Sequence, residues 1–371
     1  MKIFISTQLF YPSKLGGPAN AVYWLAKALV KSGHTVTVIT TNICVDKSIE
    51  SDKWLRVDGI KVRYCSNSGV PYLNILIQSF REIRNNDIAI LTSVCYKPEI
   101  LIAIKAIKLQ IPVIWSPRGE FSVSAISNRL DKKIYFNVIR KLLARRIIFH
   151  VTSEAEENDT LNVLGKNAKT FLIPNYMEIP EVVKRDEDIK PYFLFLGRIA
   201  PIKAIDKLIR GVALSNKFRS SNYSLRIVGM QEDKFKDYID SLRLLINQVR
   251  LEERVKIEEP KFGKDKLQLL SNASFLTLLS ESENFGNVVI EALSQATPVI
   301  ASKGTPWLTL EEYGAGFWIE NSPERIAQII DSAISLNKDQ YKHMRENAFR
   351  LAKTYDVFEN IDKWNKALSS L

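Results

Sequence analysis

The sequence predicts an α/β protein with two doubly wound domains. Short apolar runs of strand length alternate with amphipathic helical segments along the 371 residues, a pattern typical of parallel sheets covered by helices. The alternation stops once, at residues 173–191, where prolines and a run of charges replace it, and then starts again. Because a chain of this length usually exceeds one hydrophobic core, we expect one domain over about 1–175 and a second over about 176–355.

The first domain is expected to begin with a strand followed by a helix. This helix is predicted within residues 17–34, with Pro18 near its start and Gly33 as its C-terminal stop. Further strands and helices alternate to the end of the domain. The predicted strands are 2–6, 35–40, 60–65, 87–92, 112–116, 147–151 and 170–173.

The second domain repeats this alternation. Because ligands bind at the carboxyl ends of the strands in such sheets, we expect the two domains to face each other across a central cleft. After a break near Tyr355, residues 356–371 are expected to form a final helix. The predicted strands are 192–196, 224–228, 254–257, 275–279, 298–301 and 316–319.

The composition is that of a soluble globular protein. Hydrophobic residues make up 46% and charged residues 25%, and no run approaches the ~18 consecutive apolar residues of a membrane span. The apolar start at residues 1–6 is too short for a signal-peptide core, so we expect a first strand in a cytoplasmic protein. Cys44, Cys65 and Cys95 are widely spaced and lack nearby histidines, which favours neither a disulfide framework nor a zinc site.

The net charge of +11 arises in the first half of the chain. Residues 1–175 hold 24 Lys and Arg against 13 Asp and Glu, whereas residues 176–371 hold 28 of each kind. The segment 129–146 carries seven of these basic residues together with apolar residues at helical spacing. Such a helix can lie on an anionic membrane surface, and the alternative is a solvated helix whose apolar stripe packs on its own domain.

Two predicted strand ends carry groups suited to phosphate. Gly16 and Gly17 stand at the N-terminus of the first helix, where backbone N–H groups and the helix dipole favour an anion. Arg198 and Lys203 follow the strand 192–196, and two cations at such a place can clamp a diphosphate. The alternatives are a flexible loop at the first strand end and a solvated loop at the second.

A third strand end, after residues 275–279, carries two carboxylates around a helix start. Glu283 precedes a turn at 285–287, and Glu291 lies about one turn inside the helix that follows. Free N–H groups at the turn suit an anion or a hydroxyl-rich ligand, and carboxylates accept hydrogen bonds from paired sugar hydroxyls. The alternative is that both acids only complement the helix dipole.

Together these motifs resemble those of the family 4 glycosyltransferases, which are retaining enzymes of the GT-B fold. The resemblance covers nearly the whole chain, with the motifs in the expected order. Each motif alone is weak, and the four together are specific. They are Gly16-Gly17, the sequence Ile-Pro-Asn at 173–175, Arg198 with Lys203, and Glu283 with Glu291 around Phe285-Gly286.

The resemblance implies a role for each matched residue. Glu283 would accept hydroxyls of a donor sugar, and Glu291 those of the nucleotide ribose. Arg198 and Lys203 would neutralise the diphosphate leaving group, so Glu283, Arg198 and Lys203 form the expected catalytic set, with no metal and no cofactor. Gly16 and Gly17 would close over the phosphate, and the tail helix would cross back onto the first domain. The expected donor-binding residues are Gly16, Gly17, Arg198, Lys203, Glu283, Asn284, Phe285, Gly286, Asn287, Val288 and Glu291.

One loop departs from the family pattern. Many members carry a histidine in the loop that corresponds to residues 116–122, and this chain has Arg118 and Glu120 there. We expect Arg118 or Glu120 to contact the acceptor or the donor sugar. His150 follows a strand and is expected to be a core residue, the more frequent role of a lone histidine in an apolar run.

The resemblance therefore implies a metal-independent retaining glycosyltransferase that uses a nucleotide-diphosphate-sugar. Since the basic first domain would hold the acceptor, we expect a saccharide linked to polyprenyl diphosphate, at the inner face of the cytoplasmic membrane, in bacterial polysaccharide or O-antigen biosynthesis. A sugar-nucleotide epimerase on the same fold is one alternative. A non-catalytic nucleic-acid-binding protein is another, but it leaves Glu283 and Glu291 unexplained, and we expect no nucleic acid partner.

Overall fold

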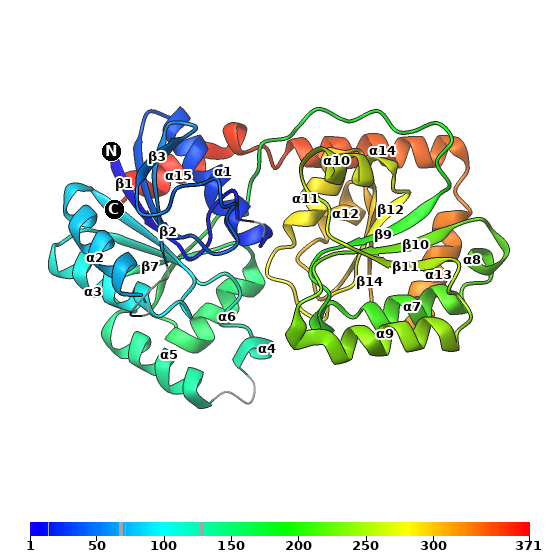
Figure 1. Cartoon of the computed structure of the whole chain (residues 1–371), viewed down its shortest axis with the longest axis horizontal. Helices are drawn as coiled ribbons and strands as arrows, with labels where there is room; N and C mark the ends of the chain where they lie inside the picture. Colours follow the sequence, from blue (N-terminus) through cyan, green and yellow to red (C-terminus); the bar gives the residue numbers. More distant parts are fainter. Residues whose placement is uncertain (14, 67–69, 71, 127–129) are drawn as a thin grey trace. The chain divides into compact units, whose positions relative to one another are not determined.

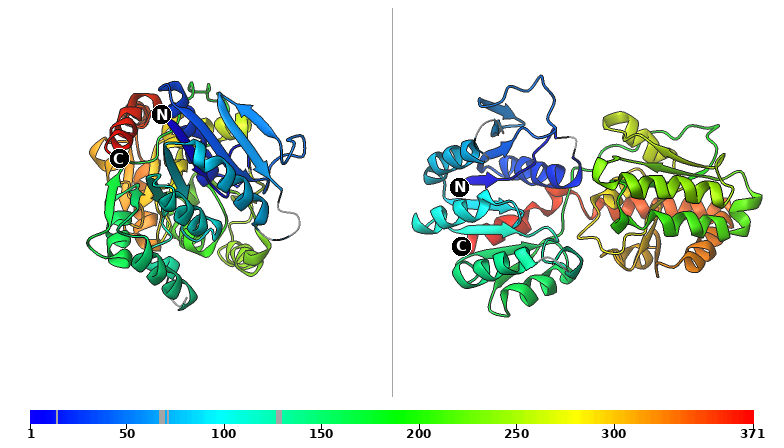
Figure 2. Two further views of the ribbon diagram at one scale, coloured as in Figure 1. Left: turned by 90° about the vertical axis from the view of Figure 1, so that its left-hand side faces the viewer. Right: turned by 60° about the horizontal axis from the view of Figure 1, so that its bottom comes forward.

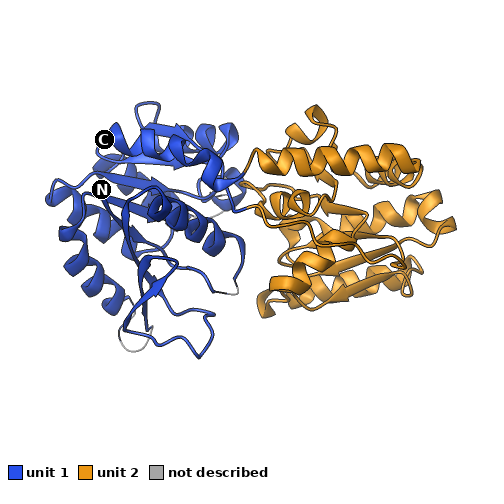
Figure 3. Cartoon of the chain, turned by 90° about the horizontal axis from the view of Figure 1, so that it is seen from above, with its two compact units in different colours: residues 1–178, 356–371 blue, residues 179–355 orange. Residues whose placement is uncertain are grey.

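The chain folds into two compact units. The structure is a computed structural model that describes every residue except 14, 67–69, 71 and 127–129. Unit 1 comprises residues 1–178 and 356–371, and unit 2 comprises residues 179–355 (Figure 3). The boundary between them falls a few residues after the predicted one. No strand or helix lies between residues 173 and 191, the segment in which the sequence pattern fails.

Unit 1 is built on an eight-stranded sheet with the order β3-β4-β2-β1-β5-β6-β7-β8 (Figure 1). Neighbouring strands run parallel, except that β3 pairs antiparallel with β4. The strands are β1 (Lys2–Ser6), β2 (Thr35–Thr41), β3 (Trp54–Val57), β4 (Ile60–Cys65), β5 (Ile88–Thr92), β6 (Val113–Ser116), β7 (Ile148–Val151) and β8 (Lys169–Leu172). The α-helices are α1 (Gly17–Lys31), α2 (Leu73–Glu82), α3 (Pro98–Lys108), α4 (Val123–Ile126), α5 (Leu130–Leu142), α6 (Glu154–Leu164) and α15 (Val357–Ser369), and a 3-10 helix, η1 (Ile83–Asn85), follows α2.

Unit 2 is built on a parallel six-stranded sheet with the order β11-β10-β9-β12-β13-β14. The strands are β9 (Tyr192–Leu196), β10 (Ser224–Val228), β11 (Val255–Glu258), β12 (Phe275–Leu278), β13 (Val299–Ser302) and β14 (Gly316–Ile319). The α-helices are α7 (Ile205–Leu214), α8 (Asn216–Ser220), α9 (Lys236–Gln248), α10 (Gly263–Asn272), α11 (Asn287–Ser294), α12 (Thr309–Glu312), α13 (Pro323–Ile334) and α14 (Lys338–Lys353), with 3-10 helices η2 (Pro201–Lys203) and η3 (Asp233–Phe235). The two doubly wound sheets confirm the predicted fold class, and each predicted strand matches an observed one to within a residue at either end.

The final helix, α15, belongs to unit 1, where it contacts α1, and it is the red helix in both views of Figure 2. Asp356 caps it by accepting hydrogen bonds from the backbone N–H groups of Phe358 (2.8 Å) and Glu359 (3.2 Å). The N–H of Val357 donates to the carbonyl oxygen of Met177 (3.0 Å), so the two chain segments at the unit boundary are joined to each other.

A buried carboxyl group lies in the core of unit 1. Glu99 of α3 is fully buried, and only one of its oxygens, Oε1, accepts a hydrogen bond within the described part of the chain, from Ser6 Oγ (2.9 Å). Burial raises the pKa of Glu99 well above its usual value because the charged form loses its hydration. The carboxyl group therefore holds its proton in the folded chain at pH values where it ionises in the unfolded chain.

We expect Glu99→Gln to make stability less dependent on pH. A raised pKa in the folded state means that wild-type stability falls as pH rises from the usual value of 4.5 to the folded-state value, by about 1.4 kcal/mol per pH unit. Glutamine keeps an acceptor for Ser6 and does not ionise, so the variant should be the more stable protein above this range. Urea unfolding of both proteins across the range measures the difference, and parallel pH profiles would contradict the expectation.

Candidate active site

Arg198 and Lys203 lie at the carboxyl end of β9, where the strand passes into η2. The exit is tightly packed, because a Cβ atom on Gly229 would lie 1.6 Å from the carbonyl oxygen of Gly197. The Arg198 side chain is 48% exposed, and its Nε lies 3.7 Å from Glu232 Oε1. The Lys203 side chain is only 16% exposed. The two predicted cations therefore differ: the Arg198 side chain is largely exposed, whereas the Lys203 side chain is mostly buried.

Lys203 forms an ion pair with Glu283, although the two residues are 80 positions apart. Both side chains are mostly buried, and Ser280 Oγ donates a second hydrogen bond to the same carboxylate oxygen, Oε2 (3.2 Å). The structure thus brings together two of the three residues, Glu283, Arg198 and Lys203, that the family resemblance assigns to the catalytic set. Because Lys203 and Ser280 both bind Oε2, this oxygen of Glu283 is held by two donors.

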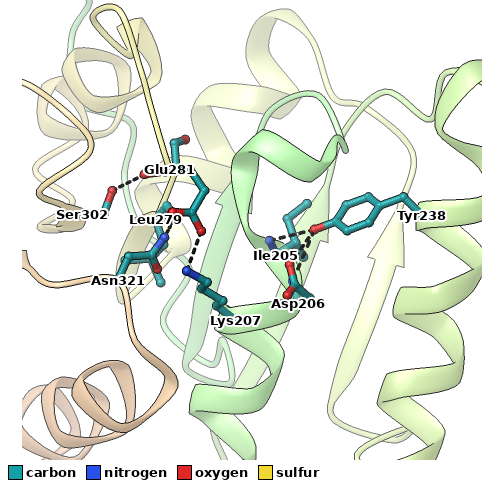
Figure 4. Close-up of polar contacts among 9 residues, drawn as sticks. Ile205, Asp206, Lys207, Tyr238, Leu279, Glu281, Ser302 and Asn321 are labelled. Carbon is teal, nitrogen blue, oxygen red and sulfur yellow. Dashed lines mark hydrogen bonds and ion pairs between the residues drawn. The ribbon is translucent and has the colours of Figure 1, made fainter. Parts of the chain in front are cut away.

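The loop that carries Glu283 is held by the ends of the neighbouring strands (Figure 4). Ser302, the last residue of β13, donates from Oγ to the carbonyl oxygen of Ser280 (2.6 Å). Asn321, just after β14, donates from Nδ2 to the carbonyl oxygen of Leu279 (2.6 Å). The end of β12 is therefore hydrogen-bonded to the ends of β13 and β14, the two strands that follow it in the order of the sheet.

Two further contacts fix the same loop. Lys207 of α7 pairs with Glu281 at 2.6 Å, also seen in Figure 4. The backbone N–H of Glu283 donates to the carbonyl oxygen of Gly304 (2.8 Å). A Cβ atom on Gly304 would lie 2.4 Å from the carbonyl oxygen of Ser280, so this close approach requires glycine. Such a rigid support is what a positioned functional carboxylate needs.

Gly286 forms the turn into α11 with a left-handed backbone (φ 80°), which glycine adopts without strain. Phe285 before it is buried and packs on Trp307 (ring centroids 5.2 Å apart), whose Nε1–H donates to the Phe285 carbonyl oxygen. No side chain of the described residues caps the start of α11. Phe285 thus anchors the turn, and the positive end of the helix dipole at Asn287 favours an anion.

Glu291 lies one turn inside α11 and pairs with Lys266 of α10 at 2.8 Å. Its side chain is 15% exposed and that of Lys266 is 23% exposed. Lys266 could not be singled out from the sequence, since nothing in the local sequence Gly-Lys-Asp-Lys distinguishes it from a solvated lysine at a helix start. Lys203 and Lys266 thus neutralise one carboxylate each on either side of the turn at 285–287.

In unit 1, the loop after β6 holds Arg118 and Glu120. Glu120 accepts hydrogen bonds from Ser93 Oγ (2.7 Å) and the backbone N–H of Cys95 (2.8 Å), and burial raises its pKa. Arg118 has a left-handed backbone (φ 54°), and its buried Nε has no hydrogen-bond partner among the described residues. Burial lowers the pKa of Arg118, and the nearby carboxylate of Glu156 opposes this shift. Glu120 is therefore engaged by the protein, whereas Arg118 keeps an unused donor.

His150 is a core residue, as predicted. It is 3% exposed, its Nδ1 accepts from Ser116 Oγ (2.8 Å), and its Nε2 donates to the carbonyl oxygen of Ile173 (2.8 Å). Burial lowers its pKa to about 3, so the imidazole is neutral. Gly16 and Gly17 stand at the start of α1 in unit 1, where Gly16 has φ 82° and no side chain among the described residues caps the helix.

Two family models match the chain. The model described as Glycosyltransferase Family 4 matches residues 15–178, and the model described as Glycosyl transferases group 1 matches residues 177–351. The chain belongs to the family 4 glycosyltransferases. The predicted donor-site residues of unit 2 lie in the region matched by the Glycosyl transferases group 1 model. The region matched by the Glycosyltransferase Family 4 model contains Gly16, Gly17, Arg118 and Glu120.

Relatives of this chain carry the names of glycosyltransferases. A D-inositol 3-phosphate glycosyltransferase from Kineococcus radiotolerans is 32% identical over 168 residues, so the match spans 40% of this chain and only 38% of that relative. A GDP-mannose:cellobiosyl-diphosphopolyprenol alpha-mannosyltransferase from Xanthomonas oryzae pv. oryzae is 22% identical over 99% of this chain and 97% of the relative. The crystal structure of HepE from Anabaena in complex with UDP and glucose superimposes with a TM-score of 0.82 at 21% identity, covering both chains completely. The family 4 chain therefore has the GT-B fold.

Proposed function

We propose that this chain is a retaining glycosyltransferase that moves a sugar from a nucleotide-diphosphate-sugar to a hydroxyl of a saccharide acceptor. The proposal rests chiefly on the mostly buried Lys203–Glu283 pair beside the start of α11. A fixed cation, a fixed carboxylate and the positive end of the helix dipole together match a ligand that carries both a diphosphate and sugar hydroxyls. Glu291, one turn further along α11, is assigned to the ribose.

The chemistry needs little more than placed charges. A nucleoside diphosphate is a good leaving group, so the protein must mainly stabilise negative charge on the departing phosphate and positive charge on an oxocarbenium-like sugar. We assign the first task to Lys203, Arg198 and the N–H groups at the start of α11, without a metal ion. In a same-face transfer the departing phosphate oxygen takes the proton of the attacking hydroxyl. No carboxylate nucleophile is then required, and Glu283 holds the sugar.

We assign the acceptor to unit 1 and propose that it is a saccharide linked to a lipid diphosphate, as in the assembly of a bacterial polysaccharide or O-antigen. The excess of positive charge in residues 1–175 supports an anionic acceptor. The Xanthomonas relative, named as an enzyme that acts on a cellobiosyl-diphosphopolyprenol, supports the same class.

A donor and acceptor panel tests the proposal. The protein is incubated with UDP-, GDP- and other nucleotide-sugars, with and without polyprenyl-diphosphate saccharides, and transfer and donor hydrolysis are measured. If no donor and acceptor pair gives transfer, and no donor is hydrolysed, the proposed enzymatic function is overturned. A product with inverted anomeric configuration by NMR would overturn retention, and loss of transfer in EDTA would overturn metal independence.

Two glutamine variants separate the assigned roles of the carboxylates. Glu283→Gln should lower kcat more than donor affinity, because Glu283 holds the reacting sugar. Glu291→Gln should weaken donor binding by about 10- to 100-fold, the cost of one charge-assisted hydrogen bond, with a smaller change in kcat. Isothermal titration with the donor and steady-state kinetics measure both effects, and the reverse pattern would exchange the roles. Lys266→Met is the matched control, since an equal loss of affinity would show that Glu291 acts only through its partner Lys266.

For the loop after β6, we propose that Arg118 contacts a substrate sugar and that Glu120 positions the loop. Arg118→Ala should raise the KM of the acceptor or of the donor by about tenfold, since a hydrogen bond from a charged group is worth about 1.5–3 kcal/mol. Glu120→Gln should instead lower the unfolding midpoint, because its partners Ser93 and Cys95 are protein groups. Unchanged transfer kinetics in Arg118→Ala would remove this residue from the site.

A further inference from the structure

The helix α5 in unit 1 has two apolar faces. Phe136 and Ile139 are buried and join the hydrophobic core of the unit, with Leu143 just after the helix. Part of the apolar content of the basic segment 129–146 therefore packs on its own unit, as one of the two alternatives for this segment predicts. Arg129 lies outside the described residues.

The second apolar face is exposed. Leu130, Ile134, Val138 and Leu142 are 73%, 61%, 39% and 60% exposed, respectively. They follow one another at intervals of four residues, so they form one stripe along the whole length of the helix. An aliphatic stripe on the solvent side of a helix is not explained by packing within unit 1. We call these four residues the α5 stripe.

Basic residues lie within the α5 stripe and along one of its borders, and one acidic residue, Asp131, lies near its start. Helical spacing places Lys141 within the stripe and Lys133 and Arg140 along one border, and all three are exposed. Arg145 and Arg146 follow the helix and are also exposed. Along the border, a groove of about 470 Å³ is lined by Lys133 and Arg140 together with the apolar Ile134 and Val163. This groove combines two cations with apolar walls, as the phosphate and the acyl chains of an anionic lipid require.

We propose that the α5 stripe and its basic border dock on the surface of an anionic lipid bilayer. The aliphatic side chains enter the boundary between headgroups and acyl chains, and the cations bind lipid phosphates. A second copy of the chain fits less well, because it would bring the same basic residues against one another. A nucleic acid fits less well, because the stripe offers no aromatic side chain for base stacking. No helix in the described part of the chain is long and apolar enough to cross a membrane.

This docking is independent of the proposed transfer reaction and is tested by binding alone. The full-length protein is mixed with vesicles of phosphatidylglycerol and phosphatidylcholine, or of phosphatidylcholine alone, and the bound fraction is measured by flotation. Binding to the anionic vesicles should be at least about tenfold tighter and should weaken with salt, since each basic residue near the surface contributes about fivefold. Equal binding to both kinds of vesicle, or none, would overturn the proposal.

Two double variants separate the apolar from the electrostatic contribution. Ile134→Gln with Leu142→Gln, and Lys133→Glu with Arg140→Glu, should each weaken binding to anionic vesicles by about tenfold or more. The matched control is Leu214→Gln with Leu244→Gln in unit 2, whose leucines are 54% and 62% exposed, and it should bind like the wild type. All the altered side chains are exposed, so the thermal midpoints should agree, and the two double variants report independently if one fails to fold.

Other partners give recognisable results. Equal vesicle binding by the wild type and the Ile134→Gln, Leu142→Gln variant would show that the stripe does not enter the bilayer. A dimer seen by analytical ultracentrifugation and abolished by that variant would assign the stripe to self-association instead. Binding to an oligonucleotide as tight as that to anionic vesicles would show general attraction to polyanions. Each of these three results would overturn the docking proposal.

Discussion

Lys203→Ala should lower kcat for sugar transfer by about 100- to 1,000-fold, the range found when one preorganised group that stabilises transition-state charge is removed. The effect should be large because Lys203 is mostly buried and paired with Glu283. Its loss removes the fixed cation assigned to the leaving phosphate and leaves the carboxylate without its partner. Steady-state kinetics give kcat, and urea unfolding shows how much of the change reflects stability. Lys203→Arg restores the charge and should recover part of the activity.

Lys207→Ala is the matched control for this variant. Lys207 also pairs with a glutamate of the loop after β12, Glu281, but both side chains are much more exposed (35% and 46%). A surface ion pair contributes about 0–1 kcal/mol, so the control should keep activity to within about fivefold. Similar losses in Lys203→Ala and Lys207→Ala would show that Lys203 only supports the loop.

Gly286→Ala should destabilise the protein by about 2 to 5 kcal/mol, which adds the cost of a left-handed alanine to that of overpacking. A Cβ atom at this position would lie 2.8 Å from Leu278 Cδ2 and 3.3 Å from Glu283 Cγ. The same crowding displaces Glu283 and the start of α11, so transfer should fall by about 10- to 100-fold, as small misplacements of reacting groups do. Urea unfolding and kcat measure the two effects.

Gly33→Ala separates backbone strain from crowding. Gly33 also has a left-handed backbone (φ 89°), but among the described residues no atom beyond its chain neighbours lies within 4 Å of the position of its Cβ. The control should therefore cost only about 1–2 kcal/mol and should leave kcat unchanged. If both glycine variants lose the same stability and neither loses activity, the turn at Gly286 has no part in the site.

Hydrophobic alternation was sufficient to predict the sheets, because parallel strands buried on both faces read as short apolar runs. It missed β3, which is a partly exposed edge strand with the mixed sequence Trp-Leu-Arg-Val. The signal for β3 lies in its turn, Asp58-Gly59, where both residues have positive φ (48° and 81°), as in a two-residue hairpin. Turn chemistry was therefore the better guide at the edge of the sheet.

For the site, the sequence predicted which side chains suit the ligand but not which of them pair. Lys203 and Glu283 each suggest a contact with the donor, and only the three-dimensional fold shows that they bind each other. Lys266 could not be found, since its partner Glu291 approaches it from another helix. The roles assigned to the donor-site residues, to Arg118 and to Glu120 stay predictions until the variants above are measured.

The hydrogen bond between Val357 and Met177 joins the two chain segments that cross the unit boundary. The chain leaves unit 1 after Glu178 and re-enters it at Asp356, and these two crossing points are neighbours. Unit 2 is therefore an insertion whose two ends emerge side by side from its host. A short artificial loop can span the same gap, so unit 1 can be rebuilt as a continuous chain without unit 2, and residues 179–355 can be transplanted as a cassette into another host of the same design.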